Sequence, residues 1–81
     1  MLHRRPAEVF PPGDHIRDEI DARGWTEADL GTALGLSPAA LADVLDGHRS
    51  ITAQLATGLG RAFGTSAELW LNLDARYRLH M

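Results

Sequence analysis

Phosphate-binding groups are the main chemical resource of this sequence. Thr26 and Ser37 each stand directly before a run with helical spacing, a position typical of a helix N-cap. The backbone N–H groups at such helix ends bind phosphate oxygens. Arg49 follows the second of these runs, and Arg4 and Arg5 form a basic pair near the N-terminus. These groups favour contact with a polyanion over catalysis.

Catalytic and metal-binding constellations are missing from the sequence. It has no cysteine, no lysine and no glycine-rich phosphate loop. Ser37, Ser50 and Ser66 occupy cap or loop positions, and no motif places a base beside them. The four histidines, which lack the spacing of a zinc site, are His3, His15, His48 and His80. The sequence therefore predicts a binding protein that is not an enzyme and holds no metal and no cofactor.

The composition describes one small globular domain with an acidic balance. Of its 81 residues, 44% are hydrophobic, and eight arginines against eleven acidic residues give a formal net charge of −3. This balance suits a basic partner and opposes nucleic acid, whose binding depends on neutralised phosphates. No apolar run reaches the roughly 18 residues of a membrane span, and the first residues lack the apolar core of a signal peptide. We expect a cytoplasmic protein with no membrane contact.

Helix start and stop signals divide the chain into short helices. Residues 1–12 contain Pro6, Pro11 and Pro12, which predict an extended N-terminal arm. Beyond the arm, caps, glycines and apolar spacing predict helices over residues 14–23, 27–34, 38–46, 53–63 and 66–78. The start of the last of these is assigned to a capping box formed by Thr65 and Glu68. The expected fold is all-α, with five helices in one domain over residues 13–79.

The second and third predicted helices have the arrangement of a helix-turn-helix. A turn of three residues that contains Gly35 separates them. Thr26 and Asp29 form a capping box at the start of the first helix. Gly31 lowers helix stability in the middle of the helix over residues 27–34. A close approach of the helix over residues 38–46 explains its presence. In this motif the second helix enters the major groove of DNA.

Several segments resemble one family of regulators. Residues 25–52, WTEADLGTALGLSPAALADVLDGHRSIT, resemble the helix-turn-helix of the lambda-repressor-like (XRE) proteins. The flanks narrow this resemblance: residues 10–14 (FPPGD) are similar to the opening of HigA-type antitoxins, and residues 49–52 (RSIT) to their loop before the fourth helix. Residues 64–73 (GTSAELWLNL) are similar to the C-terminal block of the same antitoxins. The resemblance covers nearly the whole chain.

The resemblance implies a type II toxin–antitoxin module. A HigA-type antitoxin is a homodimer that binds a palindromic operator in its own promoter. It also forms a complex with a HigB-type toxin, a small basic ribonuclease of RelE-like fold. Some proteins with the same opening and block are joined or adjacent to a metallopeptidase-like domain, so the resemblance alone leaves the partner open.

The outer face of the predicted recognition helix is unusual for a DNA-binding protein. Leu41, Val44 and Leu45 face the core by their spacing. The outward residues are therefore Ala39, Ala40, Ala42, Asp43 and Asp46. Alanine contacts a thymine methyl group and aspartate accepts from cytosine N4, but neither replaces an arginine on guanine or phosphate. Arg49 is the only formal positive charge in residues 26–53, against four acidic residues, and a protonated His48 would add a second.

These residues leave three functions open. One is an autorepressor of modest affinity that depends on helix N-termini, Arg49, the arm and dimerisation. Another is a protein-binding module that has lost DNA binding and turns its acidic recognition face towards a basic partner. A third is a stand-alone phage or host regulator without a toxin.

The last predicted helix, over residues 66–78, carries more apolar surface than a small core requires. Its candidates for a two-fold dimer contact are Trp70, Leu71, Leu73 and Tyr77. Symmetric dimers of this kind explain palindromic operators. An alternative places Trp70 in the core of its own chain, against Phe63 and Leu59.

Overall fold

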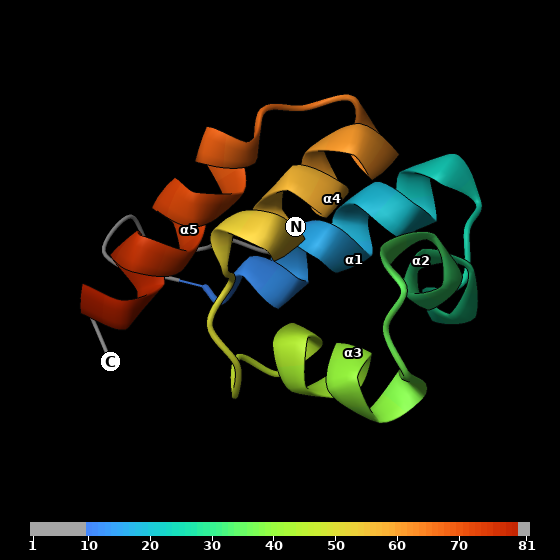
Figure 1. Ribbon diagram of the computed structural model, residues 1–81, viewed down its shortest axis with the longest axis horizontal. Helices are drawn as coiled ribbons and strands as arrows, with labels where there is room; N and C mark the ends of the chain where they lie inside the picture. Colours follow the sequence, from blue (N-terminus) through green and yellow to red (C-terminus); the bar gives the residue numbers. More distant parts are fainter. Residues whose placement is uncertain (1–9, 80–81) are drawn as a thin grey trace, which may run out of the picture.

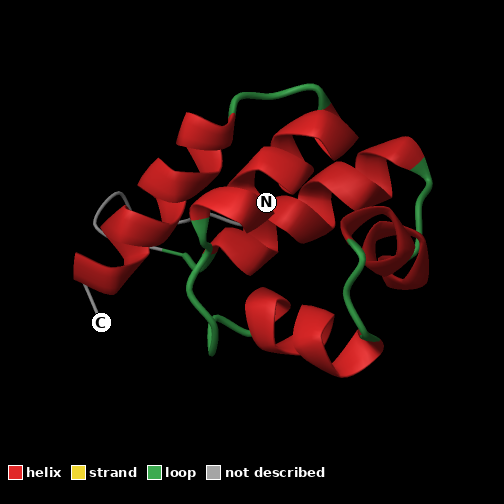
Figure 2. Cartoon of the chain, viewed as in Figure 1, coloured by secondary structure: helices red, strands yellow, loops and turns green. Residues whose placement is uncertain are grey.

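The computed structural model describes residues 10–79, which form five α-helices around a single core (Figures 1 and 2). The helices are α1 (Pro12–Arg23), α2 (Glu27–Leu34), α3 (Pro38–Leu45), α4 (Ala53–Phe63) and α5 (Ala67–Leu79). No strand occurs within residues 10–79, and the predicted all-α architecture is confirmed. Most of the predicted arm, including Arg4 and Arg5, lies outside the described residues, as do His3 and His80.

Three helices begin at a capping hydroxyl, two of them at the predicted N-caps Thr26 and Ser37 and the third at Thr52. The Thr26 hydroxyl accepts from the Asp29 N–H at 3.0 Å, and the Asp29 carboxylate accepts from the Thr26 N–H at 2.9 Å, which completes the capping box. Ser37 caps α3 and Thr52 caps α4 in the same way, each accepting from the backbone three residues later at 3.1 Å. These bonds satisfy N–H groups that a helix end leaves without partners, so the local sequence fixes where each helix starts.

The first helix begins earlier than the sequence suggested. Pro12 occupies its first turn and is buried, whereas the prediction placed the helix start at residue 14. A proline fits the first helical position, because its missing N–H has no partner there and its φ is already helical. Pro11, in an extended conformation, is the N-cap, and its carbonyl accepts from the Asp14 N–H at 3.0 Å.

The start of α5 also differs from the prediction. Ser66 is the cap, since its hydroxyl accepts from the Leu69 N–H at 3.1 Å. Thr65 instead accepts from the indole N–H of Trp70 at 2.8 Å, so the predicted capping box with Glu68 is wrong. A buried tryptophan requires a hydrogen-bond acceptor for its indole N–H, and here the threonine hydroxyl is that acceptor.

The core contains one side-chain cluster contributed by all five helices. Its buried hydrophobic members are Ile16, Ile20, Leu30, Leu41, Val44, Leu45, Ile51, Ala56, Leu59, Phe63 and Trp70. Trp70 is 1% exposed and its ring centroid lies 5.7 Å from that of Phe63. The interpretation of Trp70 as a core residue is therefore confirmed.

Close backbone contacts bring α1 and α2 against α3. A Cβ atom built on Gly13 would lie 1.9 Å from the carbonyl oxygen of Leu45, the last residue of α3. A Cβ on Gly31 would lie 3.2 Å from the Leu36 carbonyl oxygen and 3.6 Å from a Leu41 methyl group, as its mid-helix position suggested. These two glycines set the position of α3 at the lower edge of the molecule in Figure 1.

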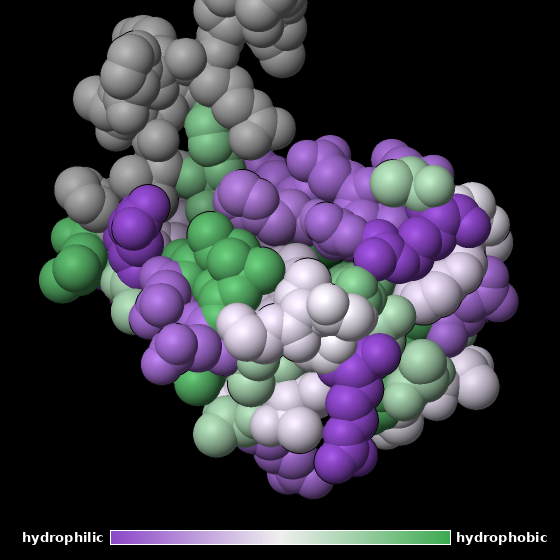
Figure 3. All heavy atoms as spheres, turned by 90° about the horizontal axis from the view of Figure 1, so that it is seen from above, coloured by the Kyte–Doolittle hydropathy of each residue, from purple (hydrophilic) through white to green (hydrophobic). Residues whose placement is uncertain are grey.

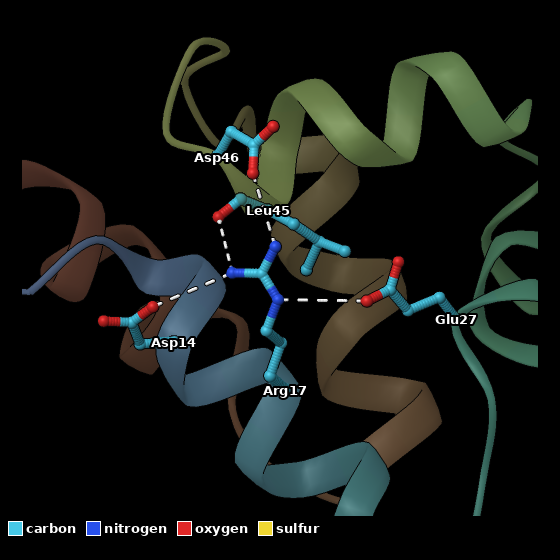
Figure 4. A network of polar contacts seen from close by, with 5 residues as sticks. All are labelled: Asp14, Arg17, Glu27, Leu45 and Asp46. Atoms are coloured by element: carbon cyan, nitrogen blue, oxygen red, sulfur yellow. Dashed lines mark hydrogen bonds and ion pairs between the residues drawn. The ribbon is translucent and has the colours of Figure 1, made fainter.

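Arg17 links the first three helices through its guanidinium group (Figure 4). It donates to the Leu45 carbonyl oxygen and to Asp46 at the end of α3, both at 3.3 Å. Its other ion pairs, each at 3.8 Å, are with Glu27 at the start of α2 and with Asp14. One cation on α1 therefore fixes one end of each helix of the helix-turn-helix.

Replacing Gly13 by alanine tests the contact between α1 and α3. The added methyl group would collide with backbone, so the helices have to separate, and we expect a loss of about 1–3 kcal/mol in the free energy of unfolding. Gly58→Ala is the matched control, because its Cβ would meet only the end of the Leu34 side chain, at 3.0 Å. We expect the control to change stability by less than about 1 kcal/mol in urea denaturation. Equal losses in the two variants would contradict this packing.

Removing the guanidinium of Arg17 tests the ion-pair network. Arg17→Met keeps the aliphatic stem, and we expect it to lower the free energy of unfolding by about 1 kcal/mol, since the partners are partly exposed. The loss should shrink as salt rises. Arg61→Met is the control, because Arg61 is exposed and has no ion pair within residues 10–79. A loss that does not depend on salt would assign the effect to the hydrogen bond with the Leu45 carbonyl oxygen and not to the ion pairs.

Candidate nucleic-acid interface

The outer face of α3 is small and mostly uncharged. Leu41, Val44 and Leu45 point into the core and are at most 3% exposed. The predicted outward residues Ala39, Ala42, Asp43 and Asp46 are exposed, whereas Ala40 is half-buried. Without long side chains, this face allows the helix backbone to approach another surface closely.

The N-termini of α2 and α3 combine a capping hydroxyl with unused backbone donors. The hydroxyls of Thr26 and Ser37 are already acceptors for their own helices. Direct contacts from these hydroxyls are therefore limited to the proton that each can still donate. The N–H groups of the first turn that the caps do not use remain available to an anion.

The loop between α3 and α4 presents three exposed residues between two buried ones. Gly47 and Ile51 are buried, whereas His48, Arg49 and Ser50 between them are exposed. Gln54, exposed on the first turn of α4, lies beside this loop, where it lines a shallow groove together with Arg49 and Ser50. The sequence prediction named His48 and Arg49 as DNA contacts and did not include Gln54, which lies beside them in the structure.

The acidic residues of the motif are largely engaged within the chain. Glu27 and Asp46 share Arg17, and Asp29 belongs to the capping box. Asp46, predicted as a base-contacting residue, has its carboxylate turned to Arg17 (Figure 4). Asp43 is left as the acidic residue of α3 with no ion pair within residues 10–79. Arg17 offsets one of these charges, so the repulsion of phosphates is weaker by about that one charge than the motif alone would give.

Arg17 was missed because it lies outside the segment that carries the motif. Its position next to Ile16, a core residue of α1, places it at the border of the buried face. A long cation at such a border reaches across to neighbouring helices while its stem packs on the core. Its pair with Asp14 follows from the i,i+3 spacing, but no signal in the sequence says that it meets Glu27 and Asp46.

The outer surface of α5 is more apolar than the surface around α3. Leu71, Leu73 and Tyr77 are half-buried, and Leu69 and Leu79 are 42% and 82% exposed. Figure 3 shows apolar surface gathered at the end of the molecule that α5 occupies. Trp70, by contrast, offers almost no surface to a partner.

Other kinds of site receive no support from the described residues. No helix within residues 10–79 is both long and apolar enough to cross a bilayer. The same part of the chain contains no cluster of three side chains able to hold a metal ion.

Comparison with known families identifies the motif. The helix-turn-helix family HTH_3 matches residues 16–70. Virulence-associated protein A' of Dichelobacter nodosus is 38% identical over 80 residues, which are 98% of this chain and 70% of that protein.

Solved structures carry the same fold. The antitoxin HigA of Pseudomonas aeruginosa, solved with the higBA promoter, has a TM-score of 0.81 and 36% identity, over 90% of this chain and 80% of that one. An addiction module antidote protein of the HigA family from Coxiella burnetii has a TM-score of 0.80 and 32% identity, over 89% and 79%. The chain therefore belongs to the XRE-type helix-turn-helix family of DNA-binding regulators, which are not enzymes, and its structural neighbours include HigA antitoxins.

Proposed function

We propose that this protein is the antitoxin of a type II toxin–antitoxin module and represses its own promoter as a dimer. The observation that carries the proposal is the flat, exposed face of α3 beside a loop that presents Arg49. It is supported by the likeness to an antitoxin solved with promoter DNA. In this proposal α3 enters the major groove and the loop contacts the phosphate backbone.

Phosphate contacts come from few groups. Arg49 and His48 supply side-chain contacts, and the first turns of α2 and α3, at Thr26 and Ser37, supply backbone N–H groups. Arg4 and Arg5, outside the described residues, are proposed to add to them from the arm. Because few cations meet the DNA, the dependence of affinity on salt should be shallow.

Base contacts come from short side chains. Ala39 and Ala42, and at the margin the half-buried Ala40, offer methyl groups to thymine. Asp43, which has no ion pair of its own, accepts from the N4 amino group of cytosine. An aspartate in this place also repels phosphate, so it selects a base and adds little affinity.

The dimer forms through one flank of α5. Leu69, Leu73 and Tyr77 recur every four residues and so form one stripe along the helix. Leu71 and Leu79 lie on the other flank, and Trp70 faces the core. A two-fold contact along the stripe presents two copies of α3 to the two halves of a palindrome.

The second partner is a HigB-type toxin of the RelE-like class, a small basic ribonuclease. The net charge of −3 complements such a protein, and exposed acids such as Asp18 and Asp21 on α1 supply part of the field. Operator DNA and a ribonuclease toxin are both found in the cytoplasm, so the proposal places the protein there as well. A short basic reading frame next to this gene would identify the toxin.

Operator binding is tested by fluorescence anisotropy on the DNA upstream of the gene, over a salt series. We expect saturable binding, and a slope of log affinity against log salt that decreases by about 1 in Arg49→Ala. Asp43→Asn should lower the preference for cytosine at one position by about 1–3 kcal/mol.

Asp18→Asn is the control for that change, because it removes the same charge from the exposed face of α1. The control should leave the base preference unchanged. A wild-type protein that does not bind at low salt would instead favour the protein-binding module, in which the unpaired Asp43 faces a basic partner.

The dimer is tested with Leu69→Asp, read by multi-angle light scattering. Leu69 is 42% exposed, so the substitution should leave the fold intact while placing two charges in the proposed contact. We expect a monomer with an unchanged circular dichroism spectrum. Leu79→Asp is the control on the other flank and should remain dimeric. The reverse result would assign the contact to the flank with Leu71.

A further inference from the structure

The loop between α3 and α4 is held at both ends by α5. Near its start, the Arg78 guanidinium donates to the Gly47 carbonyl oxygen at 2.9 Å. At its end, the Asp74 carboxylate accepts from the Ile51 N–H at 3.2 Å. Arg78 also lies 3.3 Å from Asp74, which joins the two attachments. The two attachment points enclose the exposed residues His48, Arg49 and Ser50.

A third contact between α5 and the loop is steric. Gly47 has a φ of +78°, and a Cβ atom built on it would lie 3.1 Å from the Tyr77 hydroxyl oxygen. The tyrosine ring therefore lies against the loop backbone and leaves it no room to move towards α5. We call Asp74, Tyr77 and Arg78 the α5 clamp.

The clamp occupies positions where apolar residues would serve stability better. The spacing from Trp70 to Asp74 and from Asp74 to Arg78 is four residues. The Asp74–Arg78 pair therefore continues the core-facing stripe. Asp74 is 7% exposed and is the buried charged residue of the described chain. Burying an ion pair is often no better than packing hydrophobic residues of similar volume. The specific effect of the Asp74–Arg78 pair is to hold two backbone groups of one loop.

We propose that Asp74 and Arg78 are positioning residues for operator binding and act through the loop that carries Arg49. The inference rests on the proposed operator binding and goes beyond it, since neither residue is assigned a contact with DNA. The three loop residues are exposed, and the His48 N–H is bonded to the Asp43 carbonyl oxygen of α3 at 2.9 Å. Beyond that bond, the clamp holds the loop on either side of Arg49. The clamp thereby presents the Arg49 guanidinium beside the end of α3.

The direction in which one substitution changes operator affinity separates a positioning role from an effect of charge. Asp74→Asn removes a negative charge from a protein that binds a polyanion, so long-range electrostatics alone predicts tighter binding. Loss of positioning predicts the opposite, because the Arg78 side chain loses the charge of Asp74 beside it and holds the loop less firmly. We expect operator affinity about two- to thirtyfold weaker in anisotropy titrations. Glu68→Gln, an exposed acid on the same helix, is the control and should bind as the wild type or more tightly.

A double-mutant cycle shows whether the clamp acts through Arg49. Arg78→Met keeps the stem and removes the donors, and we expect it to weaken binding and to reduce the salt slope by about 0.9, the contribution of one phosphate. Combined with Arg49→Ala, it should cause no further loss. Arg76→Met, two residues away and exposed, removes the same charge and should bind as the wild type.

Several outcomes would overturn the inference. Tighter binding by Asp74→Asn, or independent losses in the Arg49 and Arg78 variants, would do so while the proposed operator binding stands. A wild-type protein that does not bind the DNA would overturn both. Melting temperatures and light scattering accompany each titration. If Asp74→Asn does not fold, the cycle with Arg78→Met decides.

Discussion

The end of α3 is the point on which the rest of the structure depends. Gly13 brings the backbone of α1 into contact with Leu45, and Arg17 binds the same carbonyl oxygen and the neighbouring Asp46. The loop to α4 begins at that place, so its starting point is set there as well. The orientation of α3 and the place where its flanking loop begins therefore have one origin, the close approach of α1 to a helix end.

This arrangement also eases the conflict between an acidic chain and a phosphate backbone. The formal charge counts Glu27 and Asp46 as repulsive, but both lie beside one guanidinium, which offsets one of the carboxylates that it contacts. The field at a surface depends on where charges lie, so Arg17 weakens the repulsion of phosphates without removing it. Asp43 remains, and in the proposed function it influences which bases are accepted more than how tightly the DNA is held.

Local signals made most of the fold predictable. Thr26, Ser37 and Thr52 determine helix starts through bonds to residues three positions away, and a sequence displays such spacing directly. Thr65 was misread because its true partner, the Trp70 indole, competes for the hydroxyl only in the folded chain. Arg17 and Asp74 were missed for the same reason, since their contacts with the end of α3 and with the loop join residues that are 28, 29 and 23 positions apart. Only the stripe of Trp70, Asp74 and Arg78 hinted at a buried pair.

Two stripes of residues along α5, one facing the core and one facing outwards, give this helix two roles. Its core-facing stripe ends in the clamp that holds the loop, while Leu69 and Leu73 belong to the stripe proposed for the dimer. Tyr77 takes part in both, since its ring lies against Gly47 and its position continues the dimer stripe. A change in packing at the two-fold contact would therefore reach Arg49 through a single side chain. The proposed dimer would then contribute more than a second copy of α3, because it would also stiffen the loop beside each copy.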